Sequence, residues 1–307
     1  MPNNQTPLDT LLGSQSFVLM DGATGSELHR RGIPTPLPLW STSALLDELG
    51  RQTLRQIHED YASAGAQLIT ANTFRTHARN LHSTGIADQA NQLTQAAVRI
   101  ARQATAGSSA LVAGSQAPLE DCYSPDLTPG DAELRKEHRQ MANSLADAGV
   151  DMILIETMPT VREAVAAAEA ATETRLPFAV SFVCGADGKL LSGETLQDAA
   201  AGVLPFGPRM LGVNCAPATK LRSIISQLKD ELRELETNAA AVEIIAYGNV
   251  GEPDPGIGWK STEAEQPDVY ASLAASWLEQ GVKVIGGCCG TTPGHIAALR
   301  ASRRQFE

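Results

Sequence analysis

The sequence predicts an α/β protein built as a single (β/α)8 TIM barrel that takes up residues 1–307. Three observations predict this fold. Short apolar runs of strand length alternate with longer helical stretches, which is typical of βαβ units and a parallel sheet. Eight such units in 307 residues favour a closed barrel over an open doubly wound sheet. The segment after the first run, Asp21-Gly22-Ala23-Thr24-Gly25, lacks the G-x-G-x-x-G pattern of a dinucleotide-binding fold.

The eight predicted strands are short apolar runs, many of them rich in Val, Ile and Leu, as expected for strands buried on both faces of a parallel sheet. They are Phe17–Met20, Gln67–Thr70, Ala110–Ala113, Met152–Ile155, Phe178–Val183, Met210–Val213, Ile244–Tyr247 and Lys283–Ile285.

The predicted helices lie between these runs and are longer. They cover Ala44–Ser63, Asp88–Thr105, Ala132–Ala148, Val161–Thr174, Thr219–Leu235 and Asp268–Gln280, with a weaker helix at Leu196–Ala200. Thr292-Pro293 reads as the N-cap and first residue of a last helix that runs to Ala301.

Two segments read as long loops, because they are rich in proline, glycine and acidic residues. Cys122–Gly130 follows the third strand and Gly248–Gln266 follows the seventh. In a barrel, loops after strands lie on the catalytic face. Long loops at that face are more often lids or oligomer contacts than linkers.

Composition narrows the class of partner. The formal net charge is -11, which argues against nucleic acid or an anionic membrane as partner. No apolar run approaches the roughly 18 residues of a membrane span, and the N-terminus shows no secretory signal. Five cysteines, two of them adjacent, make a poor disulfide framework. A reducing cytoplasm is therefore the expected compartment.

The cysteines at two predicted strand ends carry most of the chemical information. Cys215 follows the sixth strand, and Cys288 and Cys289 follow the eighth, so a barrel brings all three to one rim. Three thiols can hold a zinc ion with its fourth position open, and an open position is typical of a catalytic site. The preceding Gly286-Gly287 pair lets the backbone approach a ligand closely. The alternative is that these cysteines are small buried apolar residues.

Polar residues end other strands at the same rim. Asp21-Gly22 and Glu156 place carboxylates where they could bind an ammonium group, although a rim acid is also commonly paired within the protein. Asn72-Thr73-Phe74 follows the second strand and offers hydrogen bonds and an apolar wall.

Other potential metal ligands are more isolated. Cys122 and Cys184 each stand alone and are read as buried apolar residues. Most of the histidines lie away from strand ends, so an all-cysteine site is favoured, with His77 as the histidine to check.

At these residues the chain resembles the homocysteine S-methyltransferase family. The matching segments span nearly the whole chain: Met20–Leu28, Glu156-Thr157, Gly212–Cys215 and Gly286–Pro293. The resemblance implies a zinc-dependent barrel that methylates homocysteine to methionine. It implies that Cys215, Cys288 and Cys289 are zinc ligands, and that Asp21 and Glu156 hold the amino group of homocysteine. Homocysteine would then occupy the fourth zinc position as a thiolate, and its sulfur would attack the methyl group.

The methyl donor is less defined. A single barrel favours a small cationic donor such as S-methylmethionine or S-adenosylmethionine, with betaine as a further candidate, and a separate corrinoid partner protein stays open. Cationic donors suit an aromatic wall, and Trp40 resembles the tryptophan that betaine-using relatives place near the donor, with Phe74 and Tyr123 as companions. Arg75 stands where those relatives have a tyrosine, which weakens the betaine reading.

The loop after the seventh strand also departs from the family. Many relatives have Tyr-Pro-Asn there, whereas this chain has Tyr247-Gly248-Asn249. Asn249 is expected to reach the metal when substrate is absent, as the asparagine of such relatives can.

Two alternative functions remain at this stage. One is a zinc-dependent methyltransferase that acts on another thiol or a selenol. The other is a non-catalytic barrel in which the adjacent cysteines sense redox state or store metal. The oligomeric state is not readable from the sequence.

Overall fold

The computed structural model describes residues 5–235, 242–254 and 258–303 and confirms the predicted barrel. Eight parallel strands follow the order β1-β10-β7-β6-β5-β4-β3-β2. A parallel bridge between Met20 and Leu68 joins the two ends of this order and closes the barrel. The strands are β1 (Val18–Leu19), β2 (Leu68–Ala71), β3 (Leu111–Gln116), β4 (Met152–Met158), β5 (Phe178–Phe182), β6 (Met210–Pro217), β7 (Glu243–Asn249) and β10 (Val284–Gly287).

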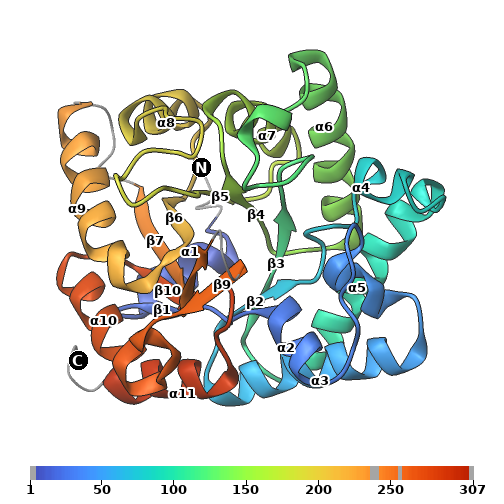
Figure 1. Cartoon of the computed structure of the whole chain (residues 1–307), viewed down its shortest axis with the longest axis horizontal. Coiled ribbons are helices and arrows are strands. Elements are labelled where there is room, and N and C mark those ends of the chain that lie inside the picture. Colours follow the sequence, from blue (N-terminus) through green and yellow to red (C-terminus); the bar gives the residue numbers. More distant parts are fainter. Residues whose placement is uncertain (1–4, 236–241, 255–257, 304–307) are drawn as a thin grey trace.

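Helices surround the strands, and the predicted ones are all present (Figure 1). They are α3 (Glu48–Ala64), α5 (Ala90–Ala104), α6 (Asp131–Ala148), α7 (Val161–Glu173), α8 (Leu196–Val203), α9 (Ala218–Glu234), α10 (Pro267–Glu279) and α11 (Pro293–Ser302). Thr292 caps α11 as predicted, because its side chain accepts a hydrogen bond from the N–H of Gly294.

Two predicted helix starts were too early. The stretch from Ala44 is first a 3-10 helix, η1 (Trp40–Leu45), and α3 begins only after Asp47, whose side chain caps it. The stretch from Asp88 likewise begins as a 3-10 turn, η2 (Ala87–Gln89), before α5. In both cases the apolar pattern runs through a change of helix type, which periodicity alone does not reveal.

Three short helices and a hairpin were not predicted. The helices are α1 (Pro7–Ser14), α2 (Thr24–Arg30) and α4 (Ala78–His82). The segment Gly248–Gln266, predicted as a loop, contains an antiparallel hairpin of β8 (Gly251–Asp254) and β9 (Gly258–Ser261). Residues 255–257 of that segment lie outside the described residues.

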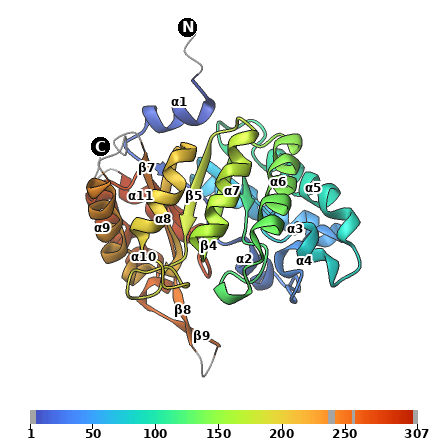
Figure 2. The same ribbon diagram turned by 90° about the horizontal axis from the view of Figure 1, so that it is seen from above.

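The core has two layers. One packs between the strands and the surrounding helices, and the other fills the barrel interior. Leu8 and Leu12 of α1 belong to the interior layer, so this helix closes one end of the barrel. Figure 2 shows α1 at that end and the β8–β9 hairpin projecting from the opposite end. Because β7 leads directly into the hairpin, the hairpin marks the C-terminal rim of the strands, where the functional residues of such barrels lie.

Candidate metal and substrate site

Three thiols converge at the C-terminal rim, as the sequence predicts. The Sγ of Cys215 lies 3.2 Å from the Sγ of Cys288 and 3.8 Å from the Sγ of Cys289. All three ligand atoms lie within 4.8 Å of one another. A disulfide would bring two sulfurs to about 2 Å, so these are separate thiols. Cys215 is buried, whereas Cys288 and Cys289 are half-buried.

The spacing of the sulfurs fits a zinc ion. Sulfur ligands about 2.3 Å from a tetrahedral zinc lie about 3.8 Å apart, which matches the 3.8 Å between Cys215 and Cys289, while the 3.2 Å between Cys215 and Cys288 is shorter. Among the described residues, this trio is the one group of three or more His, Cys, Asp or Glu side chains close enough to share a metal ion. Three protein ligands leave a fourth position for a substrate.

The ends of β6 and β4 are irregular where they present their functional residues. Cys215 and Thr157 both adopt positive φ, 56° and 64°, which is uncommon for residues other than glycine. Both strands also shift register at this point. The buried Asn214 supports these turns, since its carboxamide accepts from the N–H of Thr157 and donates to the hydroxyl oxygen of Thr157. These two hydrogen bonds join the end of β4 to the residue before Cys215, and such surrounding contacts are what maintain an uncommon backbone conformation.

Asn249 holds the backbone of two of the three cysteines. Its Nδ2 donates to the carbonyl oxygen of Cys215 at 2.8 Å, and its Oδ1 accepts from the N–H of Cys289 at 3.0 Å. Its side chain is fully buried, and both of its polar atoms are hydrogen-bonded to the backbone of two cysteines. The expected contact of Asn249 with the metal itself stays a prediction.

Without a metal, the thiols do not all ionise readily. Hydrogen bonds from Cys215 and Cys288 hold the pKa of Cys289 well below its usual range. By contrast, the hydrogen bond that Cys288 donates to Cys215 raises the pKa of Cys288. Three thiolates side by side therefore require a cation between them.

Two buried carboxyls share the rim with the thiols. Glu156 lies within β4, which is buried along its whole length, and it accepts hydrogen bonds from the hydroxyls of Ser115 and of Tyr247. Burial raises its pKa to about 7. Asp21 follows β1 and accepts from the N–H and the hydroxyl of Thr70. Burial, with a smaller contribution from the charge of Glu156, raises the pKa of Asp21 to about 8.

The raised pKa values mean that burial disfavours the charged form of both carboxyls. Both carboxyls are nearly inaccessible to solvent, and neither has an arginine or lysine among its hydrogen-bond partners in the described chain. An ammonium group placed between them would favour their charged forms.

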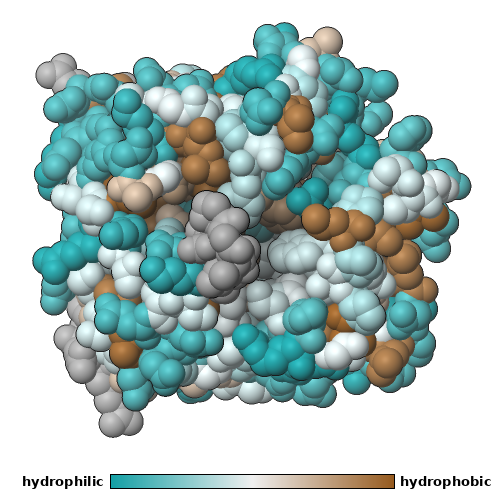
Figure 3. Space-filling model, viewed as in Figure 1, coloured by the Kyte–Doolittle hydropathy of each residue, from teal (hydrophilic) through white to brown (hydrophobic). Residues whose placement is uncertain are grey.

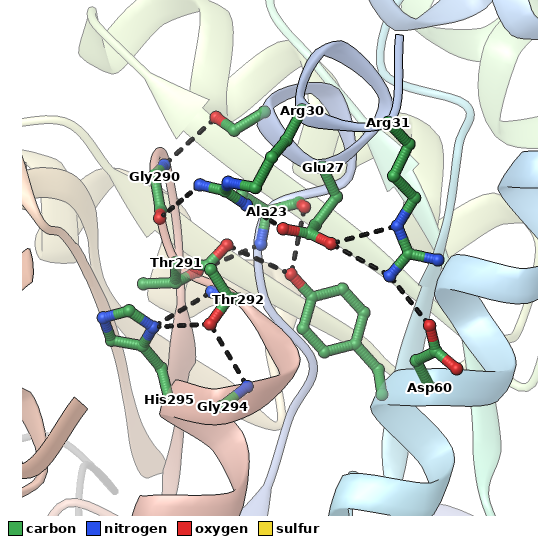
Figure 4. A network of polar contacts seen from close by, with 12 residues as sticks. Ala23, Glu27, Arg30, Arg31, Asp60, Gly290, Thr291, Thr292, Gly294 and His295 are labelled. Atoms are coloured by element: carbon green, nitrogen blue, oxygen red, sulfur yellow. Dashed lines mark hydrogen bonds and ion pairs between the residues drawn. The ribbon is translucent and has the colours of Figure 1, made fainter. Parts of the chain in front are cut away.

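A network of polar contacts joins the loop after β1 to the loop that carries the cysteine pair (Figure 4). The hydroxyl of Thr291 donates to the carbonyl of Cys288 and accepts from the N–H of Ala23. The hydroxyl of Tyr61 donates to the carbonyl oxygens of Ala23 and Thr291. The loop that follows Asp21 and the loop that carries Cys288 and Cys289 are thereby fixed to each other.

The same network extends along α2. Arg30 contacts the Glu27 carboxylate and donates to the carbonyl of Gly290, while Arg31 lies between Glu27 and Asp60 (Figure 4). Gly22 has no space for a side chain, since an added Cβ would lie 2.7 Å from the Thr291 hydroxyl and 2.8 Å from that of Tyr61. This close packing explains why a glycine follows Asp21.

The remaining predicted substrate residues lie beside this network. Asn72 and Thr73 are buried and donate to backbone carbonyls, those of Ser41 and Ser115. Trp40 packs its ring edge-on against Phe74, with ring centroids 5.8 Å apart. It also lines a cavity of about 400 Å³ whose other lining residues are Gly25, Ser26, His29, Arg30 and Thr35.

Cys122, Cys184 and His77 do not belong to the group of side chains that could share a metal ion. Cys122 and Cys184 are buried free cysteines, as expected. His77 serves as the N-cap of α4, where its Nδ1 accepts from the N–H of Asn80. The face that carries the rim is mostly hydrophilic, with apolar residues in several separate groups (Figure 3).

Sequence reasoning missed several residues that complete the site. Ser115 and Tyr247 hold Glu156, Thr70 holds Asp21, and Tyr61 and Thr291 hold the loops. Tyr247 offered a signal, because a tyrosine at the end of an apolar strand needs a partner for its buried hydroxyl. Tyr61 lies within a helix far from the motifs, and nothing local pointed to its role.

Three converging thiols and two buried carboxyls at the C-terminal rim of a closed barrel stand where the enzymes of this fold class carry their active sites, and the thiols could hold a metal ion. A family profile described as homocysteine S-methyltransferase matches residues 18–302, and the chain belongs to this family. It is 30% identical to the homocysteine S-methyltransferase of Escherichia coli strain K12, over 97% of this chain and 99% of that protein. It is 28% identical to the selenocysteine methyltransferase of Astragalus bisulcatus, over 91% and 90%.

A solved structure supports the same grouping. The metallated form of the homocysteine methyltransferase MmuM from Escherichia coli superposes with a TM-score of 0.80 at 29% identity, covering 96% of this chain and 99% of that one. Among the described residues, no helix is long and apolar enough to cross a membrane.

Proposed function

We propose that this enzyme transfers a methyl group from a small cationic donor to the sulfur of homocysteine, giving methionine, with a zinc ion held by Cys215, Cys288 and Cys289. The observation that carries the proposal is the convergence of these three thiols, at zinc-like spacing, on the rim that also holds Asp21 and Glu156. When bound, the zinc ion would keep a thiol deprotonated at neutral pH.

The two carboxyls would bind and orient the amino group of homocysteine. Asp21 and Glu156 lie buried at the rim, so an ammonium between them is shielded from water and pairs strongly with their charged forms. Gly22 would bring the backbone close to the substrate. Asn72 and Thr73 would border the pocket and fix the loop after β2. This arrangement aligns the acceptor sulfur with the methyl group.

The donor would approach along the aromatic side of the rim. Trp40 and Phe74 form an edge-on pair there, and aromatic faces attract sulfonium and quaternary ammonium groups. S-methylmethionine and S-adenosylmethionine remain the favoured donors. Betaine is weaker because Arg75 replaces the tyrosine of betaine-using relatives, and its guanidinium lies 5.8 Å from the Phe74 ring centroid.

The decisive experiment is a methyl-transfer assay on zinc-loaded protein. Homocysteine is supplied with S-methylmethionine, S-adenosylmethionine, betaine or methyltetrahydrofolate in separate reactions. Methionine formed from one donor establishes both the reaction and the donor. No methionine from any donor, with zinc bound stoichiometrically, would contradict the proposal and direct attention to another acceptor or a corrinoid partner protein.

A second acceptor class has a specific observation in its favour. One relative, 28% identical over 91% of this chain, is named a selenocysteine methyltransferase. A selenol ionises more readily than a thiol and would use the same metal position and ammonium site. The same assay with selenocysteine in place of homocysteine tests this candidate, and a kcat/KM for selenocysteine well above that for homocysteine would favour it.

A further inference from the structure

One residue outside the proposed ligand set contacts a metal-binding sulfur. The hydroxyl oxygen of Tyr123 lies 3.1 Å from the Sγ of Cys215. For the three sulfurs of the cluster, the side-chain hydrogen bonds within the described chain join the sulfurs to one another and, outside the cluster, to Tyr123. Cys215 therefore differs from Cys288 and Cys289 in having a hydrogen bond with a phenol.

The loop after β3 holds Tyr123 in place. The carboxylate of Asp121 accepts hydrogen bonds from the N–H of Tyr123 and the hydroxyl of Ser124, and the N–H of Ser124 donates to the Asp121 carbonyl. Tyr123 as a whole is 40% exposed, whereas Cys215 is 7% exposed. The tyrosine thus extends from solvent to the buried sulfur. The hydrogen bonds of Asp121 with Tyr123 and Ser124 fix its position.

The direction of this hydrogen bond follows from the metal. A free thiol and a phenol can each donate to the other. A cysteine that binds zinc does so as a thiolate and has no proton. In the zinc-loaded protein the phenol must donate and Cys215 must accept.

A methyltransferase of this kind faces a competing reaction. The donor's methyl carbon can be attacked by the acceptor sulfur, but three protein thiolates surround the same ion. Attack by Cys215 would form a bond between its sulfur and the methyl carbon, break the bond from that carbon to the donor heteroatom, and release the neutral donor product. The result is a methylated Cys215 and an inactive site. A hydrogen bond to a thiolate lowers its nucleophilicity, as does any interaction that lowers its basicity.

We infer that Tyr123 protects Cys215 from methylation, by donating a hydrogen bond to its sulfur and by covering it on the solvent side, so that methyl transfer is directed to the substrate. This inference rests on the proposed function, because it assumes a metal-bound Cys215 and an electrophilic methyl donor. It makes Tyr123 a positioning and selectivity residue that need not touch the acceptor.

The test uses iodomethane as the methyl source and omits homocysteine. Zinc-loaded wild type, Tyr123→Phe and Leu127→Ala are treated in parallel, and methylation of each cysteine is followed by peptide mass spectrometry. Leu127 is an exposed residue of the same loop and serves as the matched control. In this reaction the carbon–iodine bond breaks, iodide leaves, and a sulfur–carbon bond forms.

The expected result is specific to one cysteine. Wild type and Leu127→Ala should methylate Cys215 more slowly than Cys288 and Cys289. Tyr123→Phe keeps the covering ring but loses the donor, so methylation of Cys215 should be roughly three- to tenfold faster, the range expected from losing one hydrogen bond to a charged sulfur. The rates at Cys288 and Cys289 should stay near those of wild type.

A substitution that keeps the whole ring provides the second measurement. Fluorinated tyrosine incorporated at position 123 is a stronger hydrogen-bond donor and should slow methylation of Cys215 further. The inference is overturned if Cys215 in wild type reacts as fast as the cysteine pair, or if Tyr123→Phe and the fluorinated protein leave its rate unchanged. Neither result depends on methionine formation, so failure of the proposed function would show separately in the donor assay.

Discussion

Glu156 gives the clearest residue-scale prediction, because its protonation state changes near neutral pH. Burial raises its pKa to about 7, so the side chain is mainly neutral below that pH and charged above it. An ammonium ligand needs the charged form. The affinity for L-methionine, a ligand without a free thiol, should therefore rise as pH increases through about 7, and rise further towards about 8 as Asp21 also ionises. Isothermal titration calorimetry between pH 6 and 8 measures this.

The matched variant is Glu156→Gln, which mimics the neutral acid at every pH. It should bind L-methionine at least about tenfold more weakly above pH 7, the cost of losing a hydrogen bond to a charged group. Its affinity should rise with pH less than that of wild type, because only Asp21 of the two carboxyls still ionises, and its zinc content should match that of wild type. An unchanged methionine affinity at pH 8 would remove Glu156 from the ammonium site.

The titration of Glu156 also affects the stability of the folded protein, which should fall as pH rises, whereas the affinity for methionine should increase. The pKa of Glu156 in the folded state lies above the ordinary value of 4.5, so the folded protein binds the proton more tightly than the unfolded chain. The stabilisation is complete below about pH 4.5 and is lost as pH rises towards about 7. Ligand-free wild type should accordingly lose more stability than Glu156→Gln between these pH values, as urea unfolding would show.

Asn249 carries a second residue-scale prediction. Asn249→Ala removes the two hydrogen bonds that hold the backbone of Cys215 and Cys289. Such supporting residues typically contribute 10–100-fold to metal affinity. Zinc affinity, measured by competition with a chelator, should fall by roughly that factor while the helical circular dichroism stays unchanged. Asn91→Ala, at an exposed site on α5, is the control and should bind zinc like wild type.

At the residue scale, the sequence revealed the groups that carry chemistry and missed those that support them. Cys288 and Cys289 lie between glycines after one predicted strand, and Cys215 follows another, so local patterns exposed them. Ser115 and Tyr247 sit on strands that are distant in sequence from Glu156, and their contact with it depends on barrel packing. The metal contact of Asn249 stays a prediction, because it depends on a side-chain orientation that no sequence pattern determines.

At the scale of elements, the loops after β1 and β10 act as one unit through Tyr61 and Thr291. Tyr61→Phe deletes the hydroxyl that donates to the carbonyls of Ala23 and Thr291. Because these groups lie in a buried network, the variant should lose about 1–2 kcal/mol in its free energy of unfolding. Urea denaturation measures this, and an unfolding midpoint equal to that of wild type would show that the loops are held by other contacts.

The elements that sequence reasoning missed share a physical reason. Helices α1, α2 and α4 have 8, 7 and 5 residues, too short for an apolar period to emerge. The β8–β9 hairpin follows β7 through glycines and prolines that also suit a loop. By contrast, the strands of the barrel are continuous apolar runs, and the pattern located all eight of them.

At the scale of the whole molecule, the barrel converts distant sequence positions into neighbours. Cys215 and Cys288 are 73 residues apart in the chain, yet their sulfurs lie 3.2 Å apart because β6 and β10 flank β7 and end at one rim. The alternation of strands and helices predicted this convergence. The exact sulfur spacing could not be predicted, since it depends on the positive φ of Cys215 and the register shift of β6.

A metal ion that bridges β6 and β10 should stabilise the entire barrel. Zinc at about 1,000 times its dissociation constant adds roughly 4 kcal/mol to the stability of a protein whose unfolded chain does not bind it. For a domain of this size that corresponds to a rise in Tm of about 8 °C. Chelation of the zinc-loaded protein under reducing conditions should therefore lower Tm by about this amount, as differential scanning calorimetry would show.

Two variants locate the source of that stabilisation. Cys215→Ser should show little or no change in Tm when zinc is added or removed, because one of three ligands is lost and the two strands are no longer joined through the ion. Cys184→Ala also removes a buried thiol, but one outside the cluster, and should keep the full zinc-dependent shift. An equal shift in Tm in both variants would mean that zinc stabilises the barrel from another position. The convergence of β6 and β10 would then have no part in binding the zinc ion.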